Sequence, residues 1–170
     1  MEELIEKAKK GDKEAFICLV KLYEQNLYKI AKAKLYNEDD ICDAMQETMI
    51  SAYKGIKKLK NKIYFKTWLI KILINKCNDI LTNNIIYKDK LQRCNITEDK
   101  SPFEKIENEL DFQSILNILN EYDRIIVVLY YSNDFNLTEI SKILDLNVNT
   151  VKTRLFRARN KIKDYYKGEW

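Results

Sequence analysis

Glycine and proline are scarce in this chain, and their scarcity constrains its fold more than any other sequence feature. Its 170 residues include three glycines and one proline, the two residues that most strongly interrupt helices. Apolar residues recur at the three- and four-residue spacing of amphipathic helices, and strand-like alternation is not sustained anywhere. The sequence therefore predicts an all-α fold.

A few capping residues divide the first half of the chain into helices. Gly11 lies where a first helix would end, and Asp12 can cap the next. The segment 37–40 breaks the second helix and supplies a cap for a third. These boundaries predict helices over residues 13–35, 41–56 and 65–81. The second helix should direct inward a set of apolar side chains: Phe16, Leu19, Val20, Tyr23, Leu27, Ile30 and Ala31.

The helical pattern decays between the two halves of the chain. Residues 87–107 are polar, lack helical periodicity and contain the sole proline, Pro102, so they are expected to form a flexible acidic linker. The predicted organisation is two small helical domains, over residues 1–86 and 108–170. Each is small enough to be only marginally stable alone.

Charge is strongly segregated along the chain. Residues 54–76 hold eight lysines and no acid, residues 147–170 hold seven basic residues against two acids, and residues 95–123 hold eight acids against two lysines. Two basic blocks around an acidic one predict two separate surfaces that bind a polyanion. A run of charged residues usually forms only a solvated surface, so the position of each block has to decide whether it binds a polyanion.

Histidine is absent, which excludes histidine-based acid–base chemistry and histidine-ligated metals. The four cysteines are far apart without a CxxC pair, so no metal, cofactor or enzymatic activity is expected. Three of them fall in helical patterns, which predicts reduced and partly buried thiols. The charged N-terminus has no signal-peptide core, and the longest apolar run, 125–131, is too short to span a bilayer. A cytoplasmic location is therefore expected.

Residues 138–163 have the pattern of a helix-turn-helix. Asp145-Leu146-Asn147 separates two helical segments, and Asn147 is a good cap for the second. The second segment has a narrow apolar seam of Val151, Leu155, Ala158 and Ile162. Its opposite side carries the candidate DNA-contacting residues Asn149, Lys152, Thr153, Phe156 and Arg157. The alternative is an amphipathic helical hairpin with a solvated basic side.

A second candidate surface combines aromatic residues with lysines. Tyr64, Phe65 and Trp68 lie beside the basic block, a composition suited to single-stranded nucleic acid, since lysines bind phosphates while aromatic rings bind unstacked bases. The alternative is that Phe65 and Trp68 anchor the hydrophobic core, and for Trp68 this alternative is favoured.

The order of these motifs resembles that of the extracytoplasmic-function sigma factors of the bacterial sigma-70 family, which have only the region-2 and region-4 domains. The resemblance spans nearly the whole chain outside the linker. The residues that carry it are Gly11-Asp12, Ala15-Phe16, Asp40, Asp43, Gln46-Glu47, Ala52, Phe65, Thr67-Trp68-Leu69, Asn75, Asp79, Tyr122, Arg124, Leu129, Glu139-Ile140, Thr150 to Leu155 and Arg157-Ala158-Arg159.

The resemblance implies a role for each surface. The residues that would bind core RNA polymerase, at its β′ clamp, are Asp40, Asp43, Gln46 and Glu47; the β subunit is a further expected partner. Those that would capture the −10 element of promoter DNA are Lys58, Lys60, Lys62, Tyr64, Phe65 and Asn75, and the helix-turn-helix would bind the −35 element. An anti-sigma factor, in this family often membrane-anchored, is also implied.

Two positions depart from the family pattern. Asp79 is not followed by the usual basic residue three positions later, and Asp145 stands where the turn usually has glycine. Aspartate tolerates a left-handed backbone better than most residues, so the turn should survive. The rival interpretation is a self-sufficient regulator that binds a palindromic operator as a dimer through the same helix-turn-helix.

Overall fold

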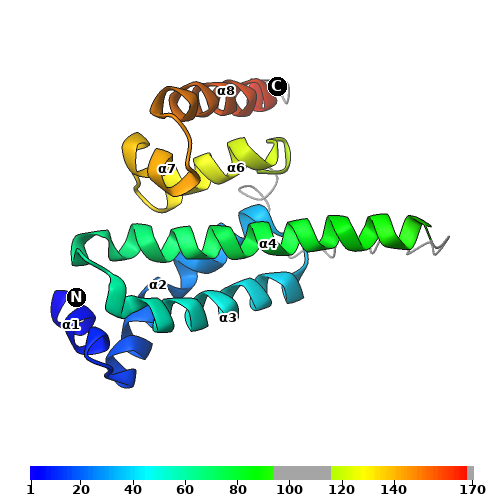
Figure 1. Ribbon diagram of the computed structural model, residues 1–170. Helices are drawn as coiled ribbons and strands as arrows, with labels where there is room; N and C mark the ends of the chain where they lie inside the picture. The colour runs from blue at the N-terminus through cyan, green and yellow to red at the C-terminus, as the bar shows by residue number, and fades with distance from the viewer. Residues whose placement is uncertain (94–115, 168–170) are drawn as a thin grey trace.

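The computed structural model describes residues 1–93 and 116–167, and every regular element within these ranges is helical (Figure 1). The predicted all-α fold is confirmed. The N-terminal half contains α1 (Glu2–Lys9), α2 (Lys13–Lys34), α3 (Glu38–Gly55), the short 3-10 helices η1 (Ile56–Lys58) and η2 (Lys62–Tyr64), and α4 (Phe65–Arg93). The C-terminal half contains α6 (Glu121–Val127), the π-helical turn η3 (Val128–Ser132), α7 (Leu137–Leu144) and α8 (Val148–Lys167).

The predicted capping residues set the ends of the first helices. Gly11 has φ +101°, a left-handed conformation that favours glycine, and the Asp12 side chain accepts a hydrogen bond from the Ala15 amide at 3.0 Å. Asn37 caps α3 by accepting from the Asp39 amide at 2.8 Å. Because Asn37 is the cap, α3 begins at Glu38, before the predicted start at residue 41.

Helix α4 is longer than its sequence predicts, since it continues past residue 81 to Arg93. Thr82 donates a side-chain hydrogen bond to the Asn78 carbonyl at 2.8 Å, and Asn84 donates to the Asp40 carboxylate on α3 at 3.0 Å. Asparagine and threonine are weak helix formers, and these bonds stabilise the helix through them. The predicted linker, 87–107, therefore starts as helix in this structure, and its residues from 94 onward lie outside the described residues.

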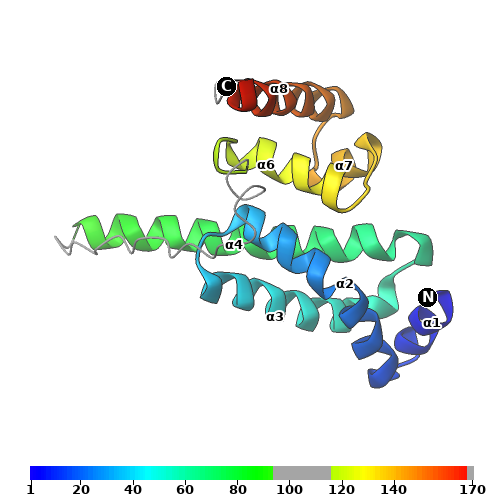
Figure 2. The same cartoon turned by 180° about the vertical axis from the view of Figure 1, so that it is seen from behind.

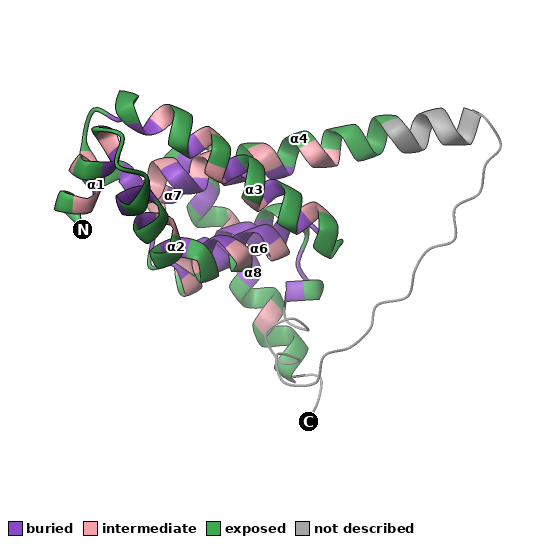
Figure 3. Cartoon of the chain, turned by 90° about the horizontal axis from the view of Figure 1, so that it is seen from below, coloured by how far each residue is buried: buried purple, intermediate pink, exposed green. Residues whose placement is uncertain are grey.

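The two halves pack against each other. Helices α2, α3 and α4 form one layer, and α6 and α7 lie between that layer and α8 (Figures 1 and 2). Helix α6 contacts α2, and α7 contacts α4. Buried side chains from both halves, among them Leu27 and Leu73 in the first and Ile125 and Leu129 in the second, form one continuous hydrophobic core. Residues 82–86 of α4 are exposed (Figure 3).

The thiols differ from the expectation of partial burial. Cys18 and Cys42 are exposed, which corrects the prediction for these two residues, whereas Cys77 is fully buried. Burial raises the pKa of the Cys77 thiol to about 12. Cys94 lies outside the described residues. Over residues 1–93 and 116–167, no helix is long and apolar enough to cross a membrane.

Candidate nucleic-acid interface

The helix-turn-helix predicted from the sequence is present. Helix α7 starts with a capping box, in which Asn136 and Glu139 each accept a hydrogen bond from the other's backbone amide at 3.0 Å. It ends at Asp145, whose φ of 53° and ψ of 43° are left-handed, as expected where glycine is usual. Asn147 accepts from the Asn149 amide at 2.8 Å and caps α8. The predicted three-residue turn is therefore confirmed.

Helix α8 has the buried seam and the exposed side that were predicted. Val151, Leu155 and Ala158 are buried, and Ile162 is half-buried. The five candidate −35 residues are all exposed: Asn149, Lys152, Thr153, Phe156 and Arg157. Phe156 is 64% exposed although it is a large apolar residue. An exposed phenylalanine between basic residues is available for apolar contact with a thymine methyl group.

A groove of about 580 Å³ lies between the start of α6 and α8. Its lining includes three predicted residues, Asn149, Thr153 and Arg157, and five that the site prediction omitted: Asn120, Asp123, Thr150, Arg154 and Lys161. Arg154 lies one turn before Ala158 on α8. The periodicity of α8 alone could not indicate that this part of the helix contacts α6. The basic groups of this groove give it the charge that phosphate oxygens require.

The lysine-rich loop that contains η1 and η2 forms the second candidate surface. Lys58, Lys60 and Tyr64 are exposed, as a surface that binds nucleic acid requires. The Lys62 ammonium lies 3.0 Å from the Glu6 carboxylate on α1 and lowers the pKa of that carboxyl. Ile63, which the site prediction did not include, is 76% exposed. Within the part of the chain that the structure describes, the loop thus presents three exposed lysines without an ion pair, Lys57, Lys58 and Lys60, beside two exposed large side chains.

Phe65 corrects the predicted −10 site. Its side chain is 1% exposed, and its ring lies 5.7 Å from the Tyr23 ring and 5.9 Å from the Trp68 ring, measured between centroids. A side chain enclosed in this way cannot stack on a base, so Phe65 belongs to the core. Trp68 is half-buried and packs against Gly55, where a Cβ atom would lie 3.1 Å from the indole ring. The core interpretation of Trp68 is therefore confirmed.

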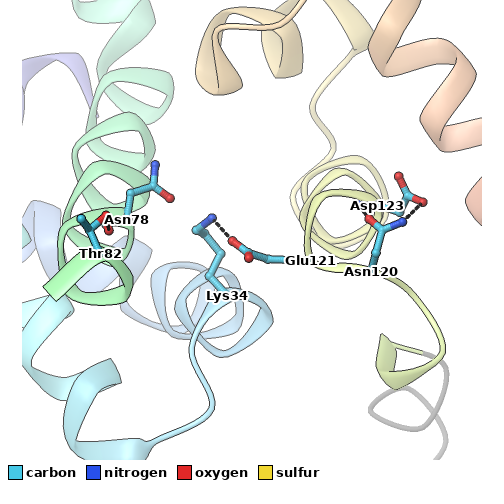
Figure 4. Close-up of polar contacts among 6 residues, drawn as sticks. All are labelled: Lys34, Asn78, Thr82, Asn120, Glu121 and Asp123. Atoms are coloured by element: carbon cyan, nitrogen blue, oxygen red, sulfur yellow. Dashed lines mark hydrogen bonds and ion pairs between the residues drawn. The ribbon is translucent and has the colours of Figure 1, made fainter. Parts of the chain in front are cut away.

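Asn75 lies apart from the loop. It follows Tyr64 by eleven residues on α4, which is about 16 Å along the helix axis. Its side of α4 faces the C-terminal half across a second cavity, of about 330 Å³, which Asn78, Thr82 and Asp145 also line. Figure 4 shows Asn78 and Thr82 on α4 beside Lys34 and Glu121 at the same junction. The structure therefore brings together the loop residues but not Asn75.

The residues expected to bind polymerase share helix α3. Asp43, Gln46 and Glu47 are exposed on one side of it. The Glu47 carboxylate lies 3.5 Å from the Lys76 ammonium. Asp40 is half-buried and accepts a hydrogen bond from Asn84 at 3.0 Å, so it also helps to hold α4.

Comparison with known proteins gives the same assignment for both halves. The family model described as Sigma-70 region 2 matches residues 19–84, and the one described as Sigma-70, region 4 matches residues 109–162. The ECF RNA polymerase sigma factor SigW of Bacillus subtilis is 28% identical over 96% of this chain and 95% of its own length. The ECF RNA polymerase sigma-E factor of Haemophilus influenzae is 28% identical over 96% of this chain and 93% of its own length.

Two solved structures have the same fold. CnrH in complex with the cytosolic domain of CnrY has a TM-score of 0.72 at 24% identity, and the match covers 98% of this chain and 97% of CnrH. The sigma factor RpoE in complex with the anti-sigma factor NepR from Bartonella quintana has a TM-score of 0.72 at 21% identity, over 89% of this chain and 96% of RpoE.

Proposed function

The chain belongs to the extracytoplasmic-function group of the sigma-70 family, and we propose that it directs core RNA polymerase to a small set of promoters through three separate surfaces. It is an RNA polymerase sigma factor, and sigma factors are transcription initiation factors. Its role is to bind core polymerase, to recognise the −35 and −10 elements and to promote the start of transcription. The chemistry of RNA synthesis belongs to the core enzyme.

The observation that carries this proposal is the exposed side of α8. Within the described residues, Lys152 and Arg157 make no ion pair, so both cations are available to DNA. A helix that buries one narrow seam and exposes a basic side can enter the major groove of duplex DNA. In our proposal Arg157 binds a base edge of the −35 element, and Lys152 at the margin binds phosphate.

The loop of η1 and η2 is the proposed −10 surface. Lys58 and Lys60 would bind the phosphates of the melted strand, and Tyr64 would stack on an extracted base. Lys62, paired with Glu6, would contribute after exchanging that partner for a phosphate. Extraction of each base costs a few kcal/mol, so binding energy from the −35 element and the polymerase has to offset it.

The exposed side of α3 is the proposed polymerase surface. Asp43, Gln46 and Glu47 lie together on it, outside both basic blocks. Both structural relatives named above were solved in a complex, CnrH with CnrY and RpoE with the anti-sigma factor NepR. We therefore include an anti-sigma factor among the proposed partners, and the cytoplasm, where core polymerase works, as the proposed location.

A single experiment tests the proposed function and the polymerase surface together. The purified chain is incubated with core polymerase, and both binding and initiation on a −35/−10 promoter are measured. The variant Gln46→Ala with Glu47→Lys should abolish both while leaving thermal stability nearly unchanged. The matched control is Glu24→Lys with Gln25→Ala, an adjacent exposed Glu–Gln pair on α2, which should leave both unchanged. Equal binding by the two double variants would refute the α3 assignment.

A further inference from the structure

Three lysines of the N-terminal half each bind an oxygen of the C-terminal half. Lys34, at the end of α2, lies 2.7 Å from the Glu121 carboxylate at the start of α6 (Figure 4). Lys66 donates to the Asn133 carbonyl at 2.5 Å and lies 4.5 Å from the centre of the Phe135 ring. Lys71 lies 2.6 Å from the Asp145 carboxylate. The contacts between the halves are therefore polar and directional as well as apolar.

These contacts cover one side of α4. Lys71, Asn75 and Asn78 lie on one side of this helix, because residues three, four and seven apart lie on the same side of an α-helix. Asn75 and Asn78 line the cavity whose opposite wall includes Leu144 and Asp145. Asn75 and Asn78 are themselves exposed, but a DNA strand that followed this side of α4 would have to share the cavity with the end of α7.

Asp145 is the unusual member of this set. It ends α7 in a left-handed conformation, φ 53°, where glycine is the ordinary residue because it has no Cβ. Its side chain is 73% exposed, and among the described residues its carboxylate is bound only by Lys71 of α4, which also donates to the Lys142 carbonyl at 3.2 Å. An aspartate therefore stands where glycine would be less strained, and its carboxylate reaches the other half of the molecule.

We propose that Asp145 is a latch: it pairs with Lys71 to hold the free chain closed, with α7 over the α4 side that carries Asn75. This inference rests on the proposed function, because a closed form matters only if α4 meets promoter DNA. The Lys34–Glu121 and Lys66–Asn133 contacts also favour the closed form. The Lys34 side chain is nearly fully buried, although its partner Glu121 is 41% exposed, whereas both members of the Lys71–Asp145 pair are exposed and the pair is weakened by salt. The pair is therefore suited to open when a polyanion competes for Lys71.

The closed form can be measured by energy transfer in the complete chain. One dye is placed on Cys18, which is exposed on α2, and the other on Lys163→Cys, which is exposed on α8. Cys42 and Cys94 are replaced by serine, while Cys77 stays because its burial keeps it unreactive. Asp145→Gly and Asp145→Asn should each lower the ratio of closed to open molecules about twofold to fivefold, the range for one exposed ion pair.

Asp134 provides a matched control. It is also an exposed aspartate with a left-handed backbone, φ 56°, and among the described residues its side chain makes no hydrogen bond or ion pair with the N-terminal half. Asp134→Gly therefore removes the same charge and the same strain without touching the latch, and energy transfer should not change. Lys71→Glu should open the molecule, and adding Asp145→Lys should close it again. A closed fraction that is the same in Asp145→Gly as in the unaltered chain, or no recovery in the swapped pair, would overturn the proposal.

The same variants separate failure of the latch from failure of the proposed function. Asp145→Gly should bind a single-stranded −10 oligonucleotide about twofold to fivefold more tightly than the unaltered chain does. Asp134→Gly should bind it no more tightly than the unaltered chain. If the chain initiates transcription with core polymerase but Asp145→Gly changes neither energy transfer nor oligonucleotide binding, the latch is wrong and the function stands. If Asp145→Gly opens the molecule but no variant supports initiation, the latch stands as a conformational feature and the proposed function fails.

Discussion

The Asp123 carboxylate lies 3.2 Å from the Nη1 atom of Arg154 and joins α6 to α8. The other carboxylate oxygen of Asp123 accepts a hydrogen bond from Asn120 at 2.6 Å. The Arg154 guanidinium also lies 5.1 Å from the centre of the Tyr122 ring. Because both oxygens are used and the side chain is only 6% exposed, Asp123 holds α8 in place against α6.

Asp123→Ala should therefore destabilise the protein. The substitution removes an ion pair and the acceptor of the Asn120 side-chain NH2 group, which should lower the free energy of unfolding by about 1–3 kcal/mol. Chemical denaturation of the complete chain measures this loss. Asp164→Ala, at an exposed acidic position on α8, should change it by less than about 0.5 kcal/mol. Equal stabilities of the two variants would show that the Asp123–Arg154 pair does not hold α8.

Arg157→Ala and Lys152→Ala should weaken −35 binding in different ways. Arg157 is near the middle of the exposed side of α8, so its loss should reduce discrimination between promoter and scrambled −35 duplexes by about 1–3 kcal/mol. Lys152 is at the margin, so its loss should weaken binding to both duplexes and make the salt dependence less steep. Binding titrations of both duplexes with holoenzyme at several salt concentrations measure both effects. Equal losses on the two duplexes for Arg157→Ala would exclude a base-reading role.

Two adjacent aromatic residues should respond in opposite ways to truncation. Phe65→Ala removes a fully buried ring and should lower the free energy of unfolding by about 3–5 kcal/mol. Tyr64 is 53% exposed, so Tyr64→Ala should leave stability nearly intact and instead weaken binding of a −10 single strand by about 1–3 kcal/mol. Thermal unfolding and oligonucleotide titration of both variants test the pair. A stable Phe65→Ala variant that fails to bind the strand would restore Phe65 to the −10 surface.

The sequence was sufficient to predict features that depend on local periodicity. The seam of Val151, Leu155 and Ala158 and the exposed side of α8 follow from a repeat of 3.6 residues, and the caps Asp12 and Asn147 follow from side chains that bind nearby amides. These features require knowledge of one helix at a time.

Features that depend on contacts between distant residues were not predictable in the same way. Phe65 is next to exposed Tyr64, and its burial depends on Tyr23, which is far away in sequence. Helix α4 continues past residue 81 with support from Asp40 on α3. The packing of the two halves depends on pairs such as Lys34–Glu121, which the charge pattern of either segment alone does not reveal.

Cys77 should make stability depend on pH in the alkaline range. Its pKa rises from 9.0 to about 12 on folding, so between these values the unfolded thiol loses its proton while the folded one keeps it. The unfolded state then binds fewer protons, and the free energy of unfolding falls as pH rises above about 9. Thermal unfolding at pH 7 and pH 10 should show a smaller drop for Cys77→Ala than for the unaltered chain. Identical drops would mean that Cys77 is not the group responsible.

The free chain should fail to open promoter DNA, and core polymerase should enable it to do so. The −35 side of α8 and the loop of η1 and η2 belong to different halves of the molecule, and α6 and α7 lie between α8 and α4 (Figure 1). To contact both promoter elements at once, the two halves must lie at the distance that separates these elements. Without a partner that fixes this distance, binding of one element adds little to the affinity for the other. The free chain should then bind duplex promoter weakly and with a steep salt dependence.

Core polymerase should fix the spacing and stabilise the melted strand. Binding should become tight and sensitive to the distance between the two elements, and thymines in the −10 region should become reactive to permanganate. The rival interpretation predicts the opposite, because a self-sufficient regulator needs no polymerase to bind its operator. A purified chain that forms a nanomolar, sequence-specific dimer on a palindrome at physiological salt would therefore show that α8 reads DNA without polymerase. Permanganate reactivity that requires both core polymerase and Tyr64 would instead place the melted strand on the loop of η1 and η2.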